Sequence, residues 1–330
     1  MRLILSRWIC NAAISLCALC ALLTGSPALS QEFPVRPIRL FVGASAGGVT
    51  DIVARVFGEK MSRFLGQPVT VENKTGAAGV LAVEAILGAP ADGHTWVISF
   101  SGPIVLRPFQ EPKLSWDPFQ VLQPVSQLYD YPLFLVARPD FPAASAAEVI
   151  ALLKQNPGKF NYGAVGRGAS THLAGELFQK ATGTSVELID YKGESAMLPD
   201  LISGRLDLGM VSPVPAIQFG NLKSGGIKVV ASTTKRLDKL PNVIAVAELG
   251  YPNFSAGGWG GLFVRAGTPM HIVQKIHGAA EEAAKDMQAM TKLTEQGVNP
   301  MSSSPAEFQA YIATEARRWA PIVRELAKGK

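Results

Sequence analysis

Glycine-rich turns that lead into amphipathic helices are the residues of this chain best suited to chemistry. The first turn, Gly43–Asp51, follows the apolar run Ile38–Val42 and precedes apolar residues at helical spacing from Ile52 onward. Its segment Gly43–Gly48 carries no bulky side chain, so its backbone N–H groups can approach a ligand closely, and the helix N-terminus behind them favours an anion. The stretch alone is equally consistent with a simple strand-to-helix turn.

Similar turns recur along the chain, each after an expected strand: Gly76–Gly79, Gly166–His172 and Tyr191–Ser195. Open α/β sheets bind ligands beyond the carboxyl ends of their strands. Two such loops that face each other across a cleft could hold the two ends of a dianion. The pattern therefore favours a binding site made of backbone donors.

The elements that must position these turns form two alternating series of strands and helices. The expected strands are Ile38–Val42, Pro68–Glu72, Thr95–Ser99, Phe160–Val165, Val186–Asp190, Leu206–Val211, Ile227–Ser232 and Leu262–Val264. Between the two series, Leu122–Ala137 reads as two consecutive extended pieces. Two α/β series separated by extended passages predict two sheet domains with a cleft between them. We expect domain 1 to comprise residues 31–130 and 256–330, and domain 2 to comprise residues 131–255.

Several local patterns make further predictions. Pro103–Pro118 is proline-rich and is expected to be irregular. Thr268-Pro269 supplies an N-cap and an N1 proline for a helix that runs to about Ala289. Ser304-Pro-Ala-Glu307 is a capping box that opens a C-terminal helix.

The first thirty residues have the pattern of a secretory signal peptide. A basic start is followed by an apolar core over Ile9–Leu23 and by the small-x-small site Ala28-Leu-Ser30. A retained anchor is the alternative, but the apolar run is short and interrupted. We expect cleavage after Ser30 and a periplasmic location. The three cysteines of the sequence all lie in this segment: Cys10, Cys17 and Cys20.

The composition argues against several classes of function. Removal of the signal peptide would lower the net charge from +5 to +3, with no basic block, so nucleic acid is not expected as a partner. A mature chain without cysteine has no thiol nucleophile or cysteine-ligated metal, and the chain shows no P-loop, dinucleotide fingerprint or metal-ligand spacing. None of the four histidines accompanies a G-x-S-x-G motif. We expect no enzyme activity, no cofactor and no metal, and a hydrolase is the least favoured alternative.

A series of motifs in register resembles the Bug family of extracytoplasmic solute receptors, which are associated with tripartite tricarboxylate transporters. The resemblance covers essentially the whole mature chain. The motifs are Arg36-Pro-Ile-Arg39, Ala46-Gly-Gly-x-x-Asp-x-x-Ala-Arg55, Leu65-Gly-Gln-Pro68, Val71-Glu-Asn73, Gly76-Ala-Ala-Gly79, Ala91-Asp-Gly-His-Thr95, Ser170-Thr-His-Leu-Ala-Gly-Glu-Leu-Phe178, Tyr191-Lys-Gly193, Asp200-Leu-Ile-Ser-Gly-Arg-Leu-Asp207, Trp259, Ala266-Gly-Thr-Pro269 and Arg318-Trp319.

The resemblance implies a type II periplasmic-binding-protein-like fold, in which two α/β domains are joined by extended hinge strands. It implies a small carboxylated solute in the cleft, no catalytic residue, and either a membrane permease of the tripartite tricarboxylate type or a sensor protein as partner of a monomeric receptor. The ligand-binding residues that it implies are Ala44, Ser45, Ala46, Gly47, Gly48, Val49, Thr50 and Asp51 in domain 1, and Gly168, Ala169, Ser170, Thr171, His172, Tyr191, Lys192, Gly193 and Ser212 in domain 2.

This sequence departs from the family pattern at three places. The first loop lacks the usual prolines, Arg167 stands where a small or apolar residue is commoner, and Glu194 follows Lys192-Gly193. An added cation and an added carboxylate near the cleft favour a ligand that carries an amine or hydroxyl. Arg167, Glu194 and Trp259, which is placed near the hinge, are therefore predicted to tune ligand choice.

Several of these residues have structural roles as alternatives. Asp51 could cap its helix rather than face the ligand, and His172 could be a packed side chain. Ser170 and Thr171 could serve both as N-caps and as ligand donors. Trp259 lies among four glycines and is more often a packing residue in such a setting, and Arg167 could be solvated.

Overall fold

The computed structural model describes residues 32–110, 114–166, 168–220 and 226–328. The chain divides into a short N-terminal unit, Met1–Val35, and a main unit, Arg36–Lys330, to which the following account refers. The expected cleavage site after Ser30 and the side chain of Arg167 lie outside the described residues. Every described helix is too short or too polar to span a membrane.

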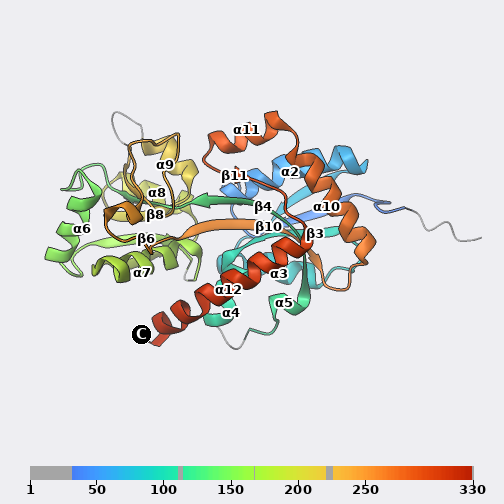
Figure 1. Ribbon diagram of the computed structural model, residues 1–330, viewed down its shortest axis with the longest axis horizontal. Helices are drawn as coiled ribbons and strands as arrows, with labels where there is room; N and C mark the ends of the chain where they lie inside the picture. Colours follow the sequence, from blue (N-terminus) through green and yellow to red (C-terminus); the bar gives the residue numbers. More distant parts are fainter. Residues whose placement is uncertain (1–31, 111–113, 167, 221–225, 329–330) are drawn as a thin grey trace, which may run out of the picture. The chain divides into compact units, whose positions relative to one another are not determined.

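The first lobe is built on a six-stranded mixed sheet with the order β11-β4-β10-β3-β1-β2 (Figure 1). Strand β1 pairs in parallel with β2 and β3, while β10 runs antiparallel to both β3 and β4. The apolar run Ile38–Val42 is the central parallel strand that its composition predicts, and four of its five residues are buried. The strands are β1 (Ile38–Val42), β2 (Val69–Asn73), β3 (Thr95–Phe100), β4 (Leu122–Pro132), β10 (Gly257–Arg265) and β11 (Asn299–Pro300).

Helices of the first lobe pack on this sheet and on one another. Helix α2 packs against α10, and α12 packs against η2, α4 and strand β4. The helices of the first lobe are α2 (Val49–Leu65), η1 (Ala77–Gly79), α3 (Val80–Leu87), η2 (Gly102–Leu106), α4 (Arg107–Gln110), α5 (Pro118–Val121), α10 (Met270–Ala284), α11 (Met287–Glu295) and α12 (Pro305–Lys328).

The second lobe is built on a five-stranded sheet with the order β7-β6-β8-β5-β9. Strand β6 pairs in parallel with β7 and β8, and β5 runs antiparallel to β8 and β9. Its elements are β5 (Phe134–Ala137), α6 (Ala146–Gln155), β6 (Asn161–Val165), α7 (Ser170–Thr182), β7 (Glu187–Tyr191), α8 (Glu194–Ile202), β8 (Leu208–Val211), α9 (Pro213–Gly220), β9 (Lys228–Ser232) and η3 (Val246–Leu249).

Two extended strands lead from one sheet to the other, as expected for hinge strands. Strands β4 and β10 stay paired up to Pro132 and Gly257, and the chain enters the second sheet at Phe134. Each predicted glycine loop follows the carboxyl end of a parallel strand, at the edge where open α/β sheets bind ligands. The domain limits at residues 130/131 and 255/256 stay a prediction.

Three local predictions are wrong. Pro103–Pro118 is helical at both ends, because Ile104, Val105 and Leu106 are buried and a proline is tolerated in a first helical turn. The helix expected to reach Ala289 stops at Ala284, and Asp286 caps a new helix by accepting a hydrogen bond from the Ala289 N–H. The side chain of Thr268 is not an N-cap but donates to the carbonyl of Arg265.

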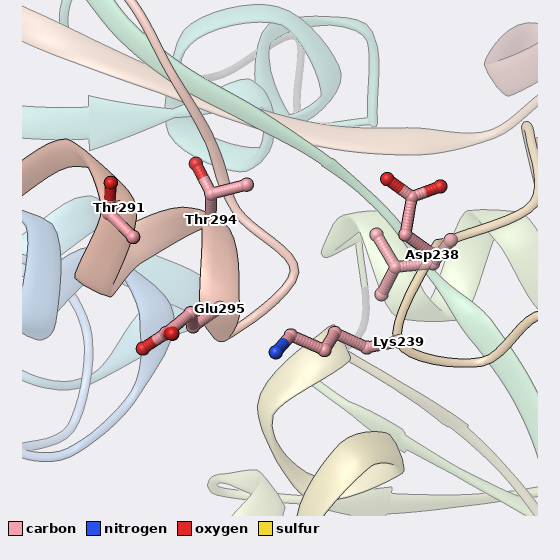
Figure 2. A pocket seen from close by; sticks show the side chains of 6 residues that line it. Asp238, Lys239, Thr291, Thr294 and Glu295 are labelled. Atoms are coloured by element: carbon pink, nitrogen blue, oxygen red, sulfur yellow. The ribbon is translucent and has the colours of Figure 1, made fainter. Parts of the chain in front are cut away.

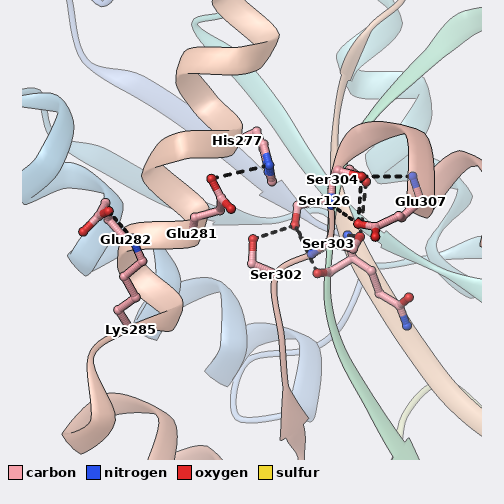
Figure 3. A network of polar contacts seen from close by, with 10 residues as sticks. Ser126, His277, Glu281, Glu282, Lys285, Ser302, Ser303, Ser304 and Glu307 are labelled. Carbon is pink, nitrogen blue, oxygen red and sulfur yellow. Dashed lines mark hydrogen bonds and ion pairs between the residues drawn. The ribbon is translucent and has the colours of Figure 1, made fainter.

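Serine side chains fasten the start of the C-terminal helix to hinge strand β4 (Figure 3). The Ser126 hydroxyl lies 3.0 Å from that of Ser302 and accepts from the Ser303 N–H. The predicted capping box is confirmed, since Ser304 accepts from the Glu307 N–H at 3.2 Å and Glu307 accepts from the Ser304 N–H at 2.8 Å.

The glycines around Trp259 belong to strand β10 and not to a loop before it, contrary to expectation. A Cβ atom at Gly258 would overlap the ring of Tyr131, and one at Gly260 would overlap the ring of Tyr129. These two glycines are two residues apart and so share one face of the sheet. Glycine is required here to admit two tyrosine rings from the neighbouring strand.

Replacement of Gly260 by alanine tests this requirement. Gly260→Ala is expected to lower the free energy of unfolding by about 1–3 kcal/mol, because the added methyl group must displace the Tyr129 ring. The control is Gly278→Ala in helix α10, where nothing lies within 4 Å of the added Cβ and stability should hold or rise slightly. Urea denaturation measures both, and equal stability of the two variants would contradict this account of the strand.

Candidate functional site

The first predicted loop leads from β1 into helix α2 through Gly47 and Gly48. Gly47 has φ +78°, a left-handed conformation that favours glycine, and Gly48 is the N-cap with no side-chain hydrogen bond. Ala46 and Gly47 are exposed, whereas Val49 and Thr50 in the first helical turn are buried. The first N–H groups of a helix have no partner within the helix, so this turn offers donors to an anion.

The Asp51 carboxylate holds this loop from inside the protein. It accepts hydrogen bonds from the Gly47 N–H at 2.9 Å, from Arg55 Nε at 3.0 Å and from Asn73 Nδ2 at 2.9 Å. Burial raises the pKa of the Asp51 carboxyl, but these hydrogen bonds and the charge of Arg55 outweigh burial and hold the pKa below its usual value. Asp51 thus has the structural role considered above, and its contact with a ligand stays a prediction.

The second loop repeats this arrangement at the start of helix α7. Gly168 has φ +89°, Ala169 is the N-cap without a side-chain hydrogen bond, and His172 Nδ1 accepts from the Gly168 N–H at 3.1 Å. The Thr171 hydroxyl accepts from the Val165 N–H at 3.0 Å. The predicted N-cap roles of Ser170 and Thr171 are wrong, because the helix begins one residue earlier than an N-cap at Ser170 would require.

In both loops the third helical residue bonds the N–H of the glycine before the N-cap. In a capping box, the side chain of the third helical residue accepts from the N-cap N–H. There, however, the N-cap side chain also accepts from an N–H of the first turn. Helices α5, α6 and α11 do have such an N-cap side chain, from Asp117, Ser145 and Asp286 respectively. Helices α2, α7 and α8 have none, so no N-cap side chain competes with a ligand for the donors of their first turns.

Loops of the two lobes meet at Ser45 and Gly193. Gly193 is the N-cap of helix α8, and a Cβ atom built on it would lie 3.2 Å from Ser45 Oγ. Likewise, a Cβ atom at Gly166 would lie 3.1 Å from the Ala78 Cβ of the first lobe. The Gly166 N–H also donates to the Tyr191 carbonyl at 3.0 Å, which links the two loops of the second lobe. The predicted loops therefore converge in the structure.

Glu194 and Ser212 bind each other at this meeting point. The Glu194 carboxylate accepts from the Ser212 N–H at 2.5 Å and from its hydroxyl at 2.7 Å. Burial raises the pKa of Glu194, and the two hydrogen bonds from Ser212 oppose that effect. Ser212 follows strand β8 and Glu194 begins helix α8, and Glu194 engages both donors of Ser212.

Two tyrosines of strand β4 belong to the same region and were not predicted. The Tyr129 hydroxyl lies 2.7 Å from Thr50 Oγ1, and its ring stacks on that of Tyr131 at a centroid distance of 5.9 Å. The charge of Glu194 contributes, after burial and Tyr129, to a raised pKa of Tyr131. The signal for them in the sequence is the pair of glycines two residues apart in the neighbouring strand, Gly258 and Gly260.

The remaining predicted residues have varied surroundings. The Tyr191 hydroxyl donates to Asp200 at 2.9 Å, and Lys192 is exposed. The Trp259 indole is buried and makes edge-to-face contacts with Phe308 and Tyr311 of helix α12. That environment is the packing role considered above, so an effect of Trp259 on a ligand would be indirect.

A separate pocket is lined by residues of helix α11 and of the loop after β9. Figure 2 shows Lys239 and Glu295 pointing toward each other across it, from the loop after β9 and from helix α11. Its lining residues are Leu237, Asp238, Lys239, Thr291, Thr294 and Glu295. None of them was predicted to bind ligand.

Substitution of Asp51 tests its role in the first loop. Asp51→Asn should lower the free energy of unfolding at pH 7 by about 1.5–3 kcal/mol, since hydrogen bonds to a charged group are lost. Because the folded-state pKa of Asp51 is lowered, its contribution to stability is complete above the unfolded pKa of about 3.9 and is lost as the pH falls through the folded value. Urea denaturation at pH 7 and pH 3 should therefore show a smaller difference between variant and wild type at pH 3; the same difference at both values would refute this role.

Comparison with known proteins places this chain in a family. The family model described as Tripartite tricarboxylate transporter family receptor matches residues 53–328. Protein BugT of Bordetella pertussis is 33% identical over 302 residues, which cover 91% of this chain and 92% of BugT.

Solved structures agree with this assignment. A protein of R. palustris solved with adipate has a TM-score of 0.83 at 30% identity, with 90% of this chain and 99% of that protein covered. MatC from Rhodopseudomonas palustris, with bound malate, has a TM-score of 0.79 at 29% identity, with 88% and 100% covered. The predicted type II periplasmic-binding-protein-like fold and the resemblance to Bug proteins are confirmed, and the chain belongs to the family of tripartite tricarboxylate transporter receptors.

Proposed function

We propose that this receptor captures a small carboxylate-bearing solute between its two lobes and delivers it to a membrane permease of the tripartite tricarboxylate type. The observation that carries the proposal is the convergence of three helix N-termini without side-chain caps, at Gly48, Ala169 and Gly193. The similar proteins solved with adipate and malate support a carboxylate as the ligand class. The proposed ligand residues are those predicted above on the three loops.

The expected strength of such a site is adequate for a receptor. A hydrogen bond to a charged group contributes roughly 1.5–3 kcal/mol, and a helix N-terminus adds about 0.3–1 kcal/mol. Four to six such bonds, reduced by the entropy lost on association, can reach the roughly −8 kcal/mol of micromolar binding. Contacts that only the closed arrangement offers would favour closure on the ligand.

The remaining parts of the proposal concern the setting of the protein. We place the mature chain in the periplasm after cleavage behind Ser30, as a monomer without cofactor, metal or enzyme activity. The family supports a permease as the partner, since its members are named as transporter receptors. Recovery of a sensor protein instead of a permease, in a pull-down from membranes with ligand present, would replace this partner. Ester or amide turnover that is lost in Ser170→Ala would show a hydrolase.

Mass spectrometry of small molecules released from the denatured purified protein tests the ligand class directly. Thermal denaturation with added carboxylates complements it, with adipate and malate as the first probes. A ligand at 100 times its dissociation constant stabilises the folded state by roughly 2.7 kcal/mol, which corresponds to a rise of several degrees in Tm. No released carboxylate and no shift across a panel of carboxylates and amino acids would refute the proposal.

A valine at Gly193 should weaken binding by about tenfold or more, since a loss of 1.4 kcal/mol is tenfold. The backbone of Gly193 has φ 178°, an extended conformation open to any residue, but the new side chain would occupy the space of Ser45 Oγ in the opposite lobe. Gly278→Val, with open space around its Cβ, is the control and should bind as wild type does. Calorimetric titration with the ligand found by mass spectrometry measures both. Unchanged affinity of the Gly193 variant would mean that these loops do not meet in the bound state.

A further inference from the structure

Glu194 stands where the second lobe reaches the first. It is the first residue of helix α8 and follows Gly193, whose added Cβ would lie 3.2 Å from Ser45 Oγ of the opposite loop. Its side chain is partly buried. The charge of Glu194 also helps, after burial and Tyr129, to raise the pKa of Tyr131 in hinge strand β4.

The two oxygens of Glu194 engage both donors of Ser212. The Ser212 N–H is 2.5 Å from Oε1, and the Ser212 hydroxyl is 2.7 Å from Oε2. This is a bidentate carboxylate on one N–H and one O–H, which is the geometry that the carboxylate of a bound solute would adopt on the same residue. Ser212 is buried, so few other directions remain for its donors. The Glu194 carboxylate thus occupies the Ser212 donors that were predicted to bind the solute.

The charge of Glu194 has no partner of opposite sign among the described residues with which it forms an ion pair. The other acid of the cleft loops, Asp51, differs in this respect, because Arg55 pairs with it at 2.9 Å. A second carboxylate brought near Glu194 would meet an uncompensated like charge in a partly buried site, where repulsion is screened less than in water. A hydroxyl or ammonium group would instead find an acceptor.

We propose that Glu194 is a specificity-determining residue that occupies the Ser212 donors, so that the site prefers a monocarboxylate with an amine or hydroxyl at its far end to a dicarboxylate of the same length. This inference rests on the proposed function, since it assumes that the first lobe binds the carboxylate. The inference specifies the group at the end of the solute that faces Glu194, namely an amine or a hydroxyl.

Matched pairs of linear acids provide the test. The mature protein is titrated by calorimetry with α,ω-diacids of four to eight carbons, and with the ω-amino and ω-hydroxy acids of the same lengths. At the chain length that binds best, the amino or hydroxy acid should bind at least about tenfold more tightly than the diacid, because a cost of 1.4 kcal/mol is tenfold. Equal or tighter binding of the diacid by wild type would overturn the inference while leaving the proposed function intact.

Variants assign the preference to Glu194. Glu194→Ala frees the Ser212 donors and should tighten the diacid while weakening the amino acid, so that the ratio of their dissociation constants falls at least about tenfold. Glu187→Ala removes an exposed carboxylate of the same lobe and should leave the ratio unchanged. A preference that survives in Glu194→Ala would overturn the role of Glu194. If no compound of either series binds any of the three proteins, the proposed carboxylate-binding function itself is refuted for linear acids, and the inference with it.

Discussion

A helix begins with N–H groups that have no partner inside the helix, and the glycine loops of this protein are built on that constraint. Most helices satisfy one of these groups with the side chain of the N-cap. Helices α2 and α7 have Gly48 and Ala169 at that position, which cannot do so. Instead, Asp51 and His172 each reach back to the N–H of the preceding glycine. The loop is thereby fixed from behind, and the donors of the first turn remain available.

The rest of the first lobe supports this arrangement. Asn73, at the end of strand β2, donates both to Asp51 and to the Ala44 carbonyl, so β2, the loop and α2 are held as one body. Thr50 in the first turn of α2 is hydrogen-bonded to Tyr129 of hinge strand β4. The Tyr129 ring fits only because Gly260 has no side chain. The position of the first glycine loop is therefore tied directly to a strand that leads into the second lobe.

Local patterns in the sequence predict those parts of the structure that local physics determines. Strand β1 is read from its apolar run, helix α2 from its periodicity, and the Ser304 cap from its spacing, and the structure confirms all three. The break at Asp286 and the inclusion of the Gly257–Gly261 run in a strand were missed. The strand depends on tyrosines that are distant along the chain, which single-segment patterns do not record. The cap at Asp286 is a local signal, since its side chain accepts from the Ala289 N–H.

The same distinction separates the predicted from the unpredicted parts of the candidate site. The loops were located because small residues after an apolar strand mark a close approach of the backbone. The pairing of Glu194 with Ser212 was not predicted, because the two residues follow different strands, β7 and β8, which lie on either side of β6. Only the order of the strands in the sheet brings their ends together.

Both lobes present helix N-termini without a side-chain cap, but the acids beside them differ in charge compensation. This difference would orient an asymmetric solute. In the first lobe, the acid of the loop is compensated by Arg55, so the donors of α2 face a solute without a competing negative charge. In the second lobe, Glu194 begins helix α8, and among the described residues its hydrogen bonds are to the neutral Ser212. If the solute binds as proposed, its negative end is favoured at the first lobe and disfavoured at Glu194. An asymmetric solute would accordingly bind in one orientation, with its carboxylate toward Gly47 and Gly48.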